Sequence, residues 1–221
     1  FEGIVHNQLI FEGKALQSEI RFYHYGYNLC EYEMQIKYKR TGDLLRQQLA
    51  ENPDNLFVMA NLVRNYRNEY DFDKVIDLAE NGLKISTSQT DLVSKNQRQR
   101  MSIDLAHALI NKNLIDKAEL VCKRALRENP DSFDILLVMG EVFMKKGVFH
   151  DALPCFKKYL ILKEKENKEP AFFILSSDFY QYEHTVYNHI GECYKHLGQI
   201  HDAIVAYKKA IELNNKDPLY Y

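Results

Sequence analysis

Large apolar, small and aromatic residues recur along the chain in an order that predicts pairs of packed helices. The clearest unit runs from His184 to Asp217, and copies in the same phase begin at Gln99 and Phe133, with a weaker copy from Leu56. The recurring places of the last unit are occupied by Tyr187, Ile190, Gly191, Tyr194, Ala203, Tyr207 and Ala210. Small residues let two helices approach closely and larger ones fill the space beside them, so each unit is expected to form a helical hairpin.

The repeats divide the chain into three predicted parts. These are an opening segment (1–29), a linker helix with half a repeat (30–55) and a repeat array (56–221). The spacing of the copies implies insertions near residues 86–96 and 163–183. We expect the first insertion to lengthen the following helix. The charged stretch from Lys163 to Lys168, in the second insertion, is expected to be a solvated, mobile loop.

Over roughly residues 43–217 the units resemble the tetratricopeptide repeat. Gly147 and Gly198 fall between the paired helices, where a residue that tolerates positive φ ends the first helix. The resemblance implies an all-α fold, a right-handed α-solenoid of helix pairs, here preceded by a short β-containing segment. It also implies a docking surface for peptides or other proteins.

In such a solenoid the first helix of each repeat lines the concave groove. The candidate groove residues are Arg64, Arg67, Asn68, Arg100, Ile103, His107, Leu137, Glu141, Met144, Asn188 and Lys195. Their mixture of basic and apolar types favours a protein or peptide ligand, but it also suits a solvated face without a tight ligand. The carboxylate clamp of chaperone-binding repeats is not reproduced, since Arg64 and His107 stand where Asn is usual.

The first 29 residues do not follow the repeat. Short β-branched and aromatic runs predict two strands, which would be marginal without a sheet to dock on. The segments VHNQL (5–9) and HYGY (24–27), with the basic helix around Lys37, resemble the end of a bacterial family 2 glycosyltransferase catalytic domain, although Asn7 replaces the usual Glu. The resemblance implies a parent enzyme that uses a nucleotide-sugar donor and a divalent metal.

Within that resemblance, His6 and His24 are candidate relics of an active site, because imidazole can ligate a metal. Each could equally be hydrogen-bonded within the local fold. Neither can transfer a sugar alone, since no βαβ units for a donor site precede them in these residues. We therefore expect no catalysis by these 221 residues themselves and no cofactor bound to them.

Other chemistry-bearing residues have a plain packing explanation. His189, Cys193 and His196 lie at i, i+4 and i+7 beside Glu192, which could form a metal site, but the repeat pattern accounts for the same positions. The Asp-x-Asp sequence at Asp71 is expected to begin a helix. The thiols Cys122 and Cys155 are expected to be buried and inert.

Composition narrows the classes of partner. The 221 residues carry 29 Lys and Arg and 31 Asp and Glu, a net charge of −2, which argues against nucleic-acid binding by bulk charge. Apolar runs are far shorter than the roughly 20 residues that cross a bilayer, and no leader is visible. The four cysteines contain no CxxC pair, which is typical of reduced thiols and predicts a cytoplasmic location. Because the first residue is Phe, we expect a fragment.

Two functions follow from these patterns. The first is a tetratricopeptide scaffold at the C-terminal end of a family 2 glycosyltransferase, where it positions a protein or glycan acceptor. The alternative is a stand-alone adaptor that binds a peptide or protein in its concave groove and has no part in sugar transfer. The sequence leaves the oligomeric state, the donor and the acceptor open.

Overall fold

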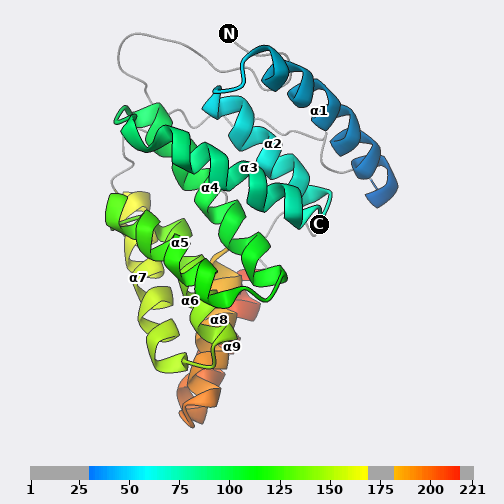
Figure 1. Ribbon diagram of the computed structural model, residues 1–221. Coiled ribbons are helices and arrows are strands. Elements are labelled where there is room, and N and C mark those ends of the chain that lie inside the picture. Colours follow the sequence, from blue (N-terminus) through cyan, green and yellow to red (C-terminus); the bar gives the residue numbers. More distant parts are fainter. Residues whose placement is uncertain (1–29, 169–181, 215–221) are drawn as a thin grey trace. The chain divides into compact units, whose positions relative to one another are not determined.

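The computed structural model describes residues 30–168 and 182–214, and these contain only helices and turns (Figure 1). The predicted strands of residues 1–29, with His6 and His24, lie outside the described residues, as does much of the second insertion. The helices separate into two compact units, α1–α4 and α5–α9, each with its own core.

The first unit consists of four α-helices and one short 3-10 helix. These are α1 (Glu31–Glu51), α2 (Leu56–Asn68), α3 (Phe72–Ile85), η2 (Ser86–Ser88) and α4 (Leu92–Asn111). Helix α2 packs against α1, α3 and α4, and its apolar side chains Met59 and Leu62 are buried with Leu45, Val75 and Leu105 from the other three helices. Part of the inserted stretch 86–96 becomes helical, because α4 begins at Leu92 and spans 20 residues.

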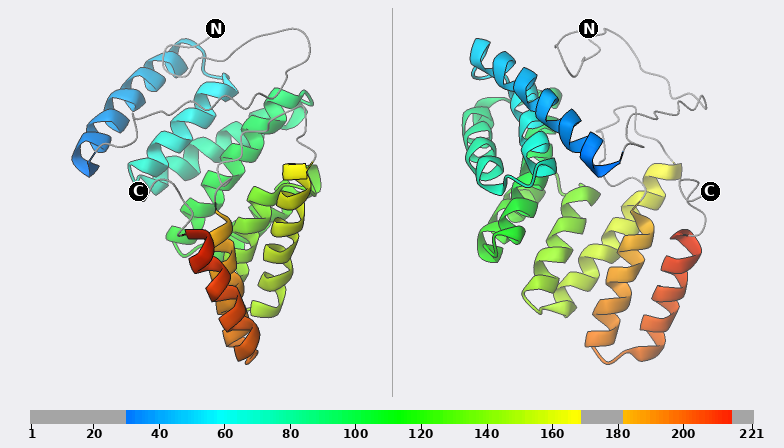
Figure 2. Two further views of the ribbon diagram at one scale, coloured as in Figure 1. Left: turned by 180° about the vertical axis from the view of Figure 1, so that it is seen from behind. Right: turned by 90° about the vertical axis from the view of Figure 1, so that its right-hand side faces the viewer.

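The second unit consists of five helices. These are α5 (Ile115–Glu128), α6 (Phe133–Lys145), α7 (Phe149–Lys168), α8 (Glu183–His196) and α9 (Ile200–Asn214). Consecutive helices pack against each other, and the right-hand view of Figure 2 shows α6 to α9 side by side. The core contains Ile135, Val138, Phe156, Tyr159 and Val186, all buried.

Small residues permit the close helix pairs, as the repeat pattern predicts. A methyl group at Gly191 of α8 would lie 2.6 Å from the ring of Tyr207 on α9, and one at Gly140 of α6 would overlap the ring of Phe156 on α7. Each glycine therefore provides space for an aromatic ring from the second helix of its own hairpin.

The turns between paired helices confirm another expectation. Gly147 and Gly198 have φ values of 74° and 76° and end the first helix of their hairpins. In the two earlier repeats Tyr70 and Asn113 adopt the same conformation, with φ values of 60° and 59°. Aspartate and asparagine tolerate this region, but an aromatic residue there is uncommon, so the sequence does not reveal the turn at Tyr70.

The prediction of a loop from Lys163 to Lys168 is wrong, although Glu164, Lys165 and Lys168 are exposed to solvent as expected. Helix α7 continues through this stretch, and Lys163 is only 2% exposed. Tyr159, one turn earlier, makes an edge-to-face contact with Phe133 of α6, and the ammonium of Lys163 lies 5.4 Å from the centre of the same ring. The aliphatic stem and the cation of Lys163 are thus accommodated against an aromatic surface, which keeps the helix docked.

Candidate functional site

Two arginines of α2 converge on one buried carboxylate of α4. The Nε of Arg64 lies 2.9 and 2.8 Å from the two carboxylate oxygens of Asp104, and Nη1 of Arg67 lies 2.7 Å from the Oδ1 atom. Asp104 is completely buried, whereas both arginine side chains remain partly exposed. We call Arg64, Arg67, Arg100 and Asp104 the arginine cluster.

Arg100 extends the cluster one turn before Asp104 on α4. Its guanidinium donates to the side-chain oxygens of Asn61 on α2 and Gln97 on α4, at 3.1 Å in both cases. The adjacent Arg98 has a structural role, because it donates to the backbone oxygens of Ser86 and Gln89 and fixes the start of α4. The fixed guanidinium of Arg100 therefore adds positive charge to the side of α4 that faces α2.

The other candidate groove residues of the first unit differ in exposure. Asn68 of α2 and His107 of α4 are half-buried. Ile103 is buried in the core, because α4 packs against both α2 and α3 and its residues from Met101 to Ala106 are all covered. Within this unit, the predicted apolar part of the groove belongs to the core and the basic part lies at the surface.

In the second unit Leu137 is likewise a core residue of α6. Glu141 and Met144 are half-buried, and Glu141 lies 3.4 Å from Nε2 of His189 on α8. Asn188 and Lys195 are exposed on α8, and Lys195 pairs with Glu192 at 3.0 Å. These residues give a mixed polar surface without the convergence of charge seen in the arginine cluster.

The metal-ligand candidates on α8 do not converge. The ring of His189 stacks on Phe156 and that of His196 on Phe149, with ring centres 5.2 and 4.0 Å apart. Cys193 is buried, and burial raises the pKa of its thiol to about 11. In the described part of the chain no three His, Cys, Asp or Glu residues form a group that could hold a metal.

Cys122 is buried as predicted, whereas Cys155 is only half-buried, and the Asp-x-Asp sequence begins a helix as predicted. Burial raises the pKa of Cys122 to about 12 and that of Cys155 to about 11, so neither is a reactive thiolate near neutral pH. The carboxylate of Asp71 accepts a hydrogen bond from the backbone N–H of Lys74 at 3.3 Å and caps α3. Asp73 pairs with Lys112 at 2.8 Å.

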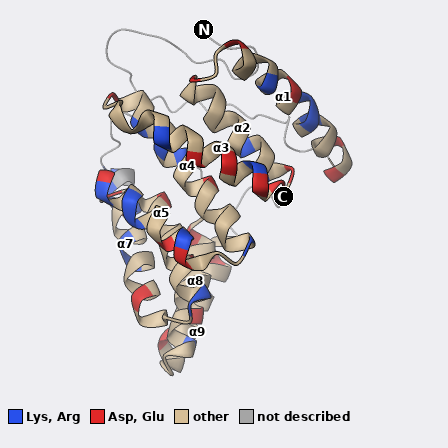
Figure 3. Cartoon of the chain, in the orientation of Figure 1, with Lys and Arg blue, Asp and Glu red and all other residues tan. Residues whose placement is uncertain are grey.

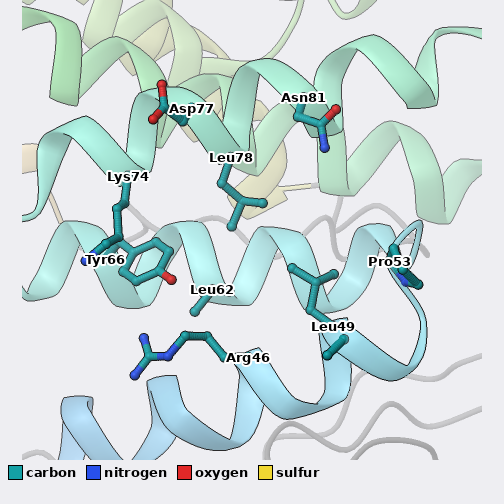
Figure 4. A pocket seen from close by; sticks show the side chains of 10 residues that line it. Arg46, Leu49, Pro53, Leu62, Tyr66, Lys74, Asp77, Leu78 and Asn81 are labelled. Carbon is teal, nitrogen blue, oxygen red and sulfur yellow. The ribbon is translucent and has the colours of Figure 1, made fainter.

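A hollow of about 550 Å³ lies between α1, α2 and α3, and no sequence pattern predicts it (Figure 4). Its walls are mainly apolar, with Leu49 from α1, Leu62 from α2 and Leu78 from α3. At one end the ring of Tyr66 contacts two cations, Arg46 at 5.9 Å and Lys74 at 5.3 Å from its centre. The hollow joins helices from two successive repeats, so only the packing of the helices brings its residues together.

The cations of this hollow do not make it an anion site. Arg46 pairs with Asp43 and Lys74 with Asp71, both at 2.5 Å, and Asp77 lies on the wall. Basic and acidic residues are also interspersed along the neighbouring helices (Figure 3). The hollow therefore suits an apolar side chain, and its paired charges give no preference for an anionic or a cationic ligand.

Comparison with known proteins supports the repeat assignment. Residues 184–217 match the family model for the tetratricopeptide repeat. Lipopolysaccharide assembly protein B of Escherichia coli strain K12 is 22% identical over 182 residues, which cover 80% of this chain and 40% of that protein. The same protein from Escherichia coli O157:H7 matches equally. The chain thus spans less than half the length of these curated relatives.

Solved structures share the fold. A crystal structure of MamA superposes with a TM-score of 0.60 at 18% identity and covers 88% of this chain and 99% of that one. Residues 41 to the end of MamA from Desulfovibrio magneticus RS-1 give a TM-score of 0.62 at 10% identity, over 85% and 95% of the two chains. Together with the match at residues 184–217, these superpositions support a solenoid of tetratricopeptide-like helical hairpins. None of the described helices is both long and apolar enough to cross a membrane.

Proposed function

We propose that the chain is a tetratricopeptide scaffold whose first unit binds an acidic segment of a partner protein. The supporting observation is the arginine cluster, in which Arg64 and Arg67 share the carboxylate of Asp104 and Arg100 is bound to neutral amides. Because Asp104 holds two of the guanidiniums in place, little side-chain entropy is lost when they contact the carboxylates of an acidic segment. An acidic partner is therefore favoured over a basic or purely apolar one.

A labelled decapeptide of alternating Glu and Leu is a suitable probe, with a Lys and Leu peptide as the specificity control. We expect only the acidic peptide to bind and its affinity to fall with added salt. Arg67→Gln should weaken binding about 10-fold, because a charge-assisted hydrogen bond to a carboxylate is lost. Arg124→Gln, at an exposed position of α5, is the matched control and should retain the affinity.

The folded state of Arg67→Gln is checked by circular dichroism, since Arg67 also contacts Asp104. If the folded variant binds the acidic peptide as tightly as the wild type does, the cluster is not the binding site. Equal binding of the acidic and basic peptides would also contradict the proposal. Fluorescence anisotropy at two salt concentrations distinguishes these outcomes.

A second candidate is the scaffold of a family 2 glycosyltransferase, in which the repeats position a protein or glycan acceptor. It is supported by the sequence of residues 5–9 and 24–27, which lie outside the described residues. In that setting a nucleotide-sugar donor and a divalent metal would bind the catalytic part of the parent enzyme. The reading frame upstream of Phe1 tests it: catalytic-domain sequence there would support the link, and a start codon directly before Phe1 would exclude it.

A further inference from the structure

The hollow between α1, α2 and α3 leaves apolar surface accessible. Among its lining residues Leu62 is buried, Leu49 and Leu78 are half-buried, and Ala50 and Pro53 are exposed. Its volume of about 550 Å³ falls within the range of roughly 300–1,000 Å³ that is typical of ligand pockets. The hollow is therefore large enough for a bulky side chain of a partner protein.

Two cations lie at one end of the hollow, beside the ring of Tyr66 (Figure 4). The guanidinium carbon of Arg46 lies 5.9 Å from the ring centre and the ammonium of Lys74 lies 5.3 Å from it. Both charges are balanced, because Arg46 pairs with Asp43 and Lys74 with Asp71. A cation that has its own carboxylate still attracts the face of an aromatic ring. This end of the hollow therefore favours a second ring over an aliphatic side chain or an anion.

The wall that α3 contributes carries a hydrogen-bond acceptor. Asp77 and Asn81 lie one turn apart on the side of α3 that lines the hollow, and both are exposed. Within the described residues, the carboxylate of Asp77 forms neither a hydrogen bond nor an ion pair. This carboxylate would repel an anionic occupant, and Lys74, one turn earlier on α3, would repel a cationic one. The wall therefore favours an uncharged occupant that donates a hydrogen bond.

We propose that the hollow binds the indole side chain of a tryptophan in a partner protein. Indole combines the three properties that the walls favour, since it is a large apolar ring, is uncharged and has a single N–H that only donates. A phenylalanine has no such donor, and cations attract a tyrosine ring less strongly than an indole. The 221 residues contain no tryptophan, so neither another segment of them nor a second copy supplies the occupant.

The uncharged peptide acetyl-Gly-Ser-Trp-Ser-Gly-amide is the probe. Because the chain has 15 tyrosines but no tryptophan, excitation at the red edge of indole absorption reports on the peptide alone. We expect a saturable blue shift of the peptide fluorescence as the 221-residue chain is added. A peptide with leucine in place of tryptophan, tested as a competitor, should bind at least about 10-fold more weakly. A peptide with 1-methyltryptophan, which lacks the N–H, should bind about 5-fold more weakly.

Two adjacent substitutions on α1 provide a matched pair. Ala50→Phe places a ring in the hollow and should weaken binding by about 10-fold or more, because the ring occupies the space of the indole. Glu51→Phe adds the same ring about 100° around the helix, outside the hollow, and should change the affinity less than about 2-fold. Both positions are exposed, and circular dichroism shows whether each variant is folded.

Asp77→Ala tests the hydrogen bond separately from the shape of the hollow. It should weaken binding of the tryptophan peptide about 5-fold, because the acceptor for the indole N–H is lost. It should leave the affinity for the 1-methyltryptophan peptide unchanged, since that peptide has no N–H to donate. A change of shape alone would affect both peptides equally.

Four results would overturn the proposal. The first is an unchanged peptide fluorescence with the folded wild-type chain, and the second is an equal effect of the two phenylalanine substitutions. The third is competition by the leucine peptide as strong as that by the tryptophan peptide, which would assign the hollow to any apolar side chain. The fourth is binding of free indole as tight as that of the peptide, which would assign it to a small molecule. Arg67→Gln should bind the tryptophan peptide as the wild type does, so this test is independent of acidic-peptide binding.

Discussion

At the scale of single residues, two contacts join side chains of different helices: Gly191 with the ring of Tyr207, and Arg64 with Asp104. Gly191 and Tyr207 belong to the recurring places, so their contact follows from the phase of the repeat. Asp104 belongs to no such place and lies 40 residues from Arg64, and only the packing of α4 on α2 brings the two together. The sequence therefore marks the arginines as candidates for binding, but it does not reveal the carboxylate that orients them.

The pairing of Gly191 with the Tyr207 ring makes a quantitative prediction. Gly191→Ala should lower the free energy of unfolding by about 1–3 kcal/mol, because the added methyl group would lie 2.6 Å from the ring. In a Tyr207→Ala background the same change should be neutral or stabilising, since alanine favours helix over glycine by about 1 kcal/mol. Urea unfolding followed by circular dichroism measures both. A loss of the same size in the two backgrounds would mean that the ring does not limit the space.

At the scale of helices, the α8–α9 hairpin depends on a titratable group. The hydroxyl of Tyr207 on α9 donates to the carboxylate of Glu192 on α8, which also pairs with Lys195. These two contacts, the hydroxyl first, lower the pKa of Glu192 below its usual value of 4.5. The ionised carboxylate is thus bound more favourably in the folded state than in the unfolded chain.

The free energy of unfolding in acid should therefore depend on the ionisation of Glu192. A depressed folded-state pKa contributes stability that is fully present above the unfolded value near 4.5 and is lost as the pH falls through the lower folded value. Glu192→Gln should remove this part of the acid-induced loss. Tyr207→Phe should reduce it, because the strongest hydrogen bond to the carboxylate is gone. Thermal unfolding between pH 3 and 7 tests this. If both variants lose as much stability between pH 7 and 3 as the wild type does, other groups cause the loss of stability in acid.

Helix boundaries show where the sequence pattern loses its reliability. The paired helices and the glycine turns follow from residues with a strong local preference, and they were predicted. The extension of α7 through Lys168 does not follow from the sequence, because the polarity of the charged stretch favours a loop. Phe133 of the preceding helix accommodates Lys163, so a tertiary contact overrides the preference of a lysine-rich stretch for solvent.

At the scale of the whole molecule, the packing within each unit is local in chain order. The helices that pack extensively are neighbours or next neighbours, α1 to α4 in one unit and α5 to α9 in the other. The sequence predicts this arrangement because it repeats, although the division of the array after Lys112 leaves no mark in the repeat pattern. Each surface that we propose for binding is also local in chain order, since its residues come from helices that are neighbours or next neighbours.

Because the packing is local, a destabilising substitution in one unit should leave the protection of the other unit against hydrogen exchange unchanged. Asp104→Asn removes the charge shared by Arg64 and Arg67 and should destabilise the first unit by about 3 kcal/mol, because two guanidiniums then face each other without their carboxylate. Hydrogen exchange followed by mass spectrometry should show faster exchange in α2 and α4 and unchanged exchange in α8 and α9. In a repeat array stability is nearly a sum of neighbour terms, so the effect should fade with distance along the chain. Equal acceleration in α8 and α9 would instead show that the nine α-helices of the described residues unfold as one cooperative unit, in which the arginine cluster stabilises more than its own unit.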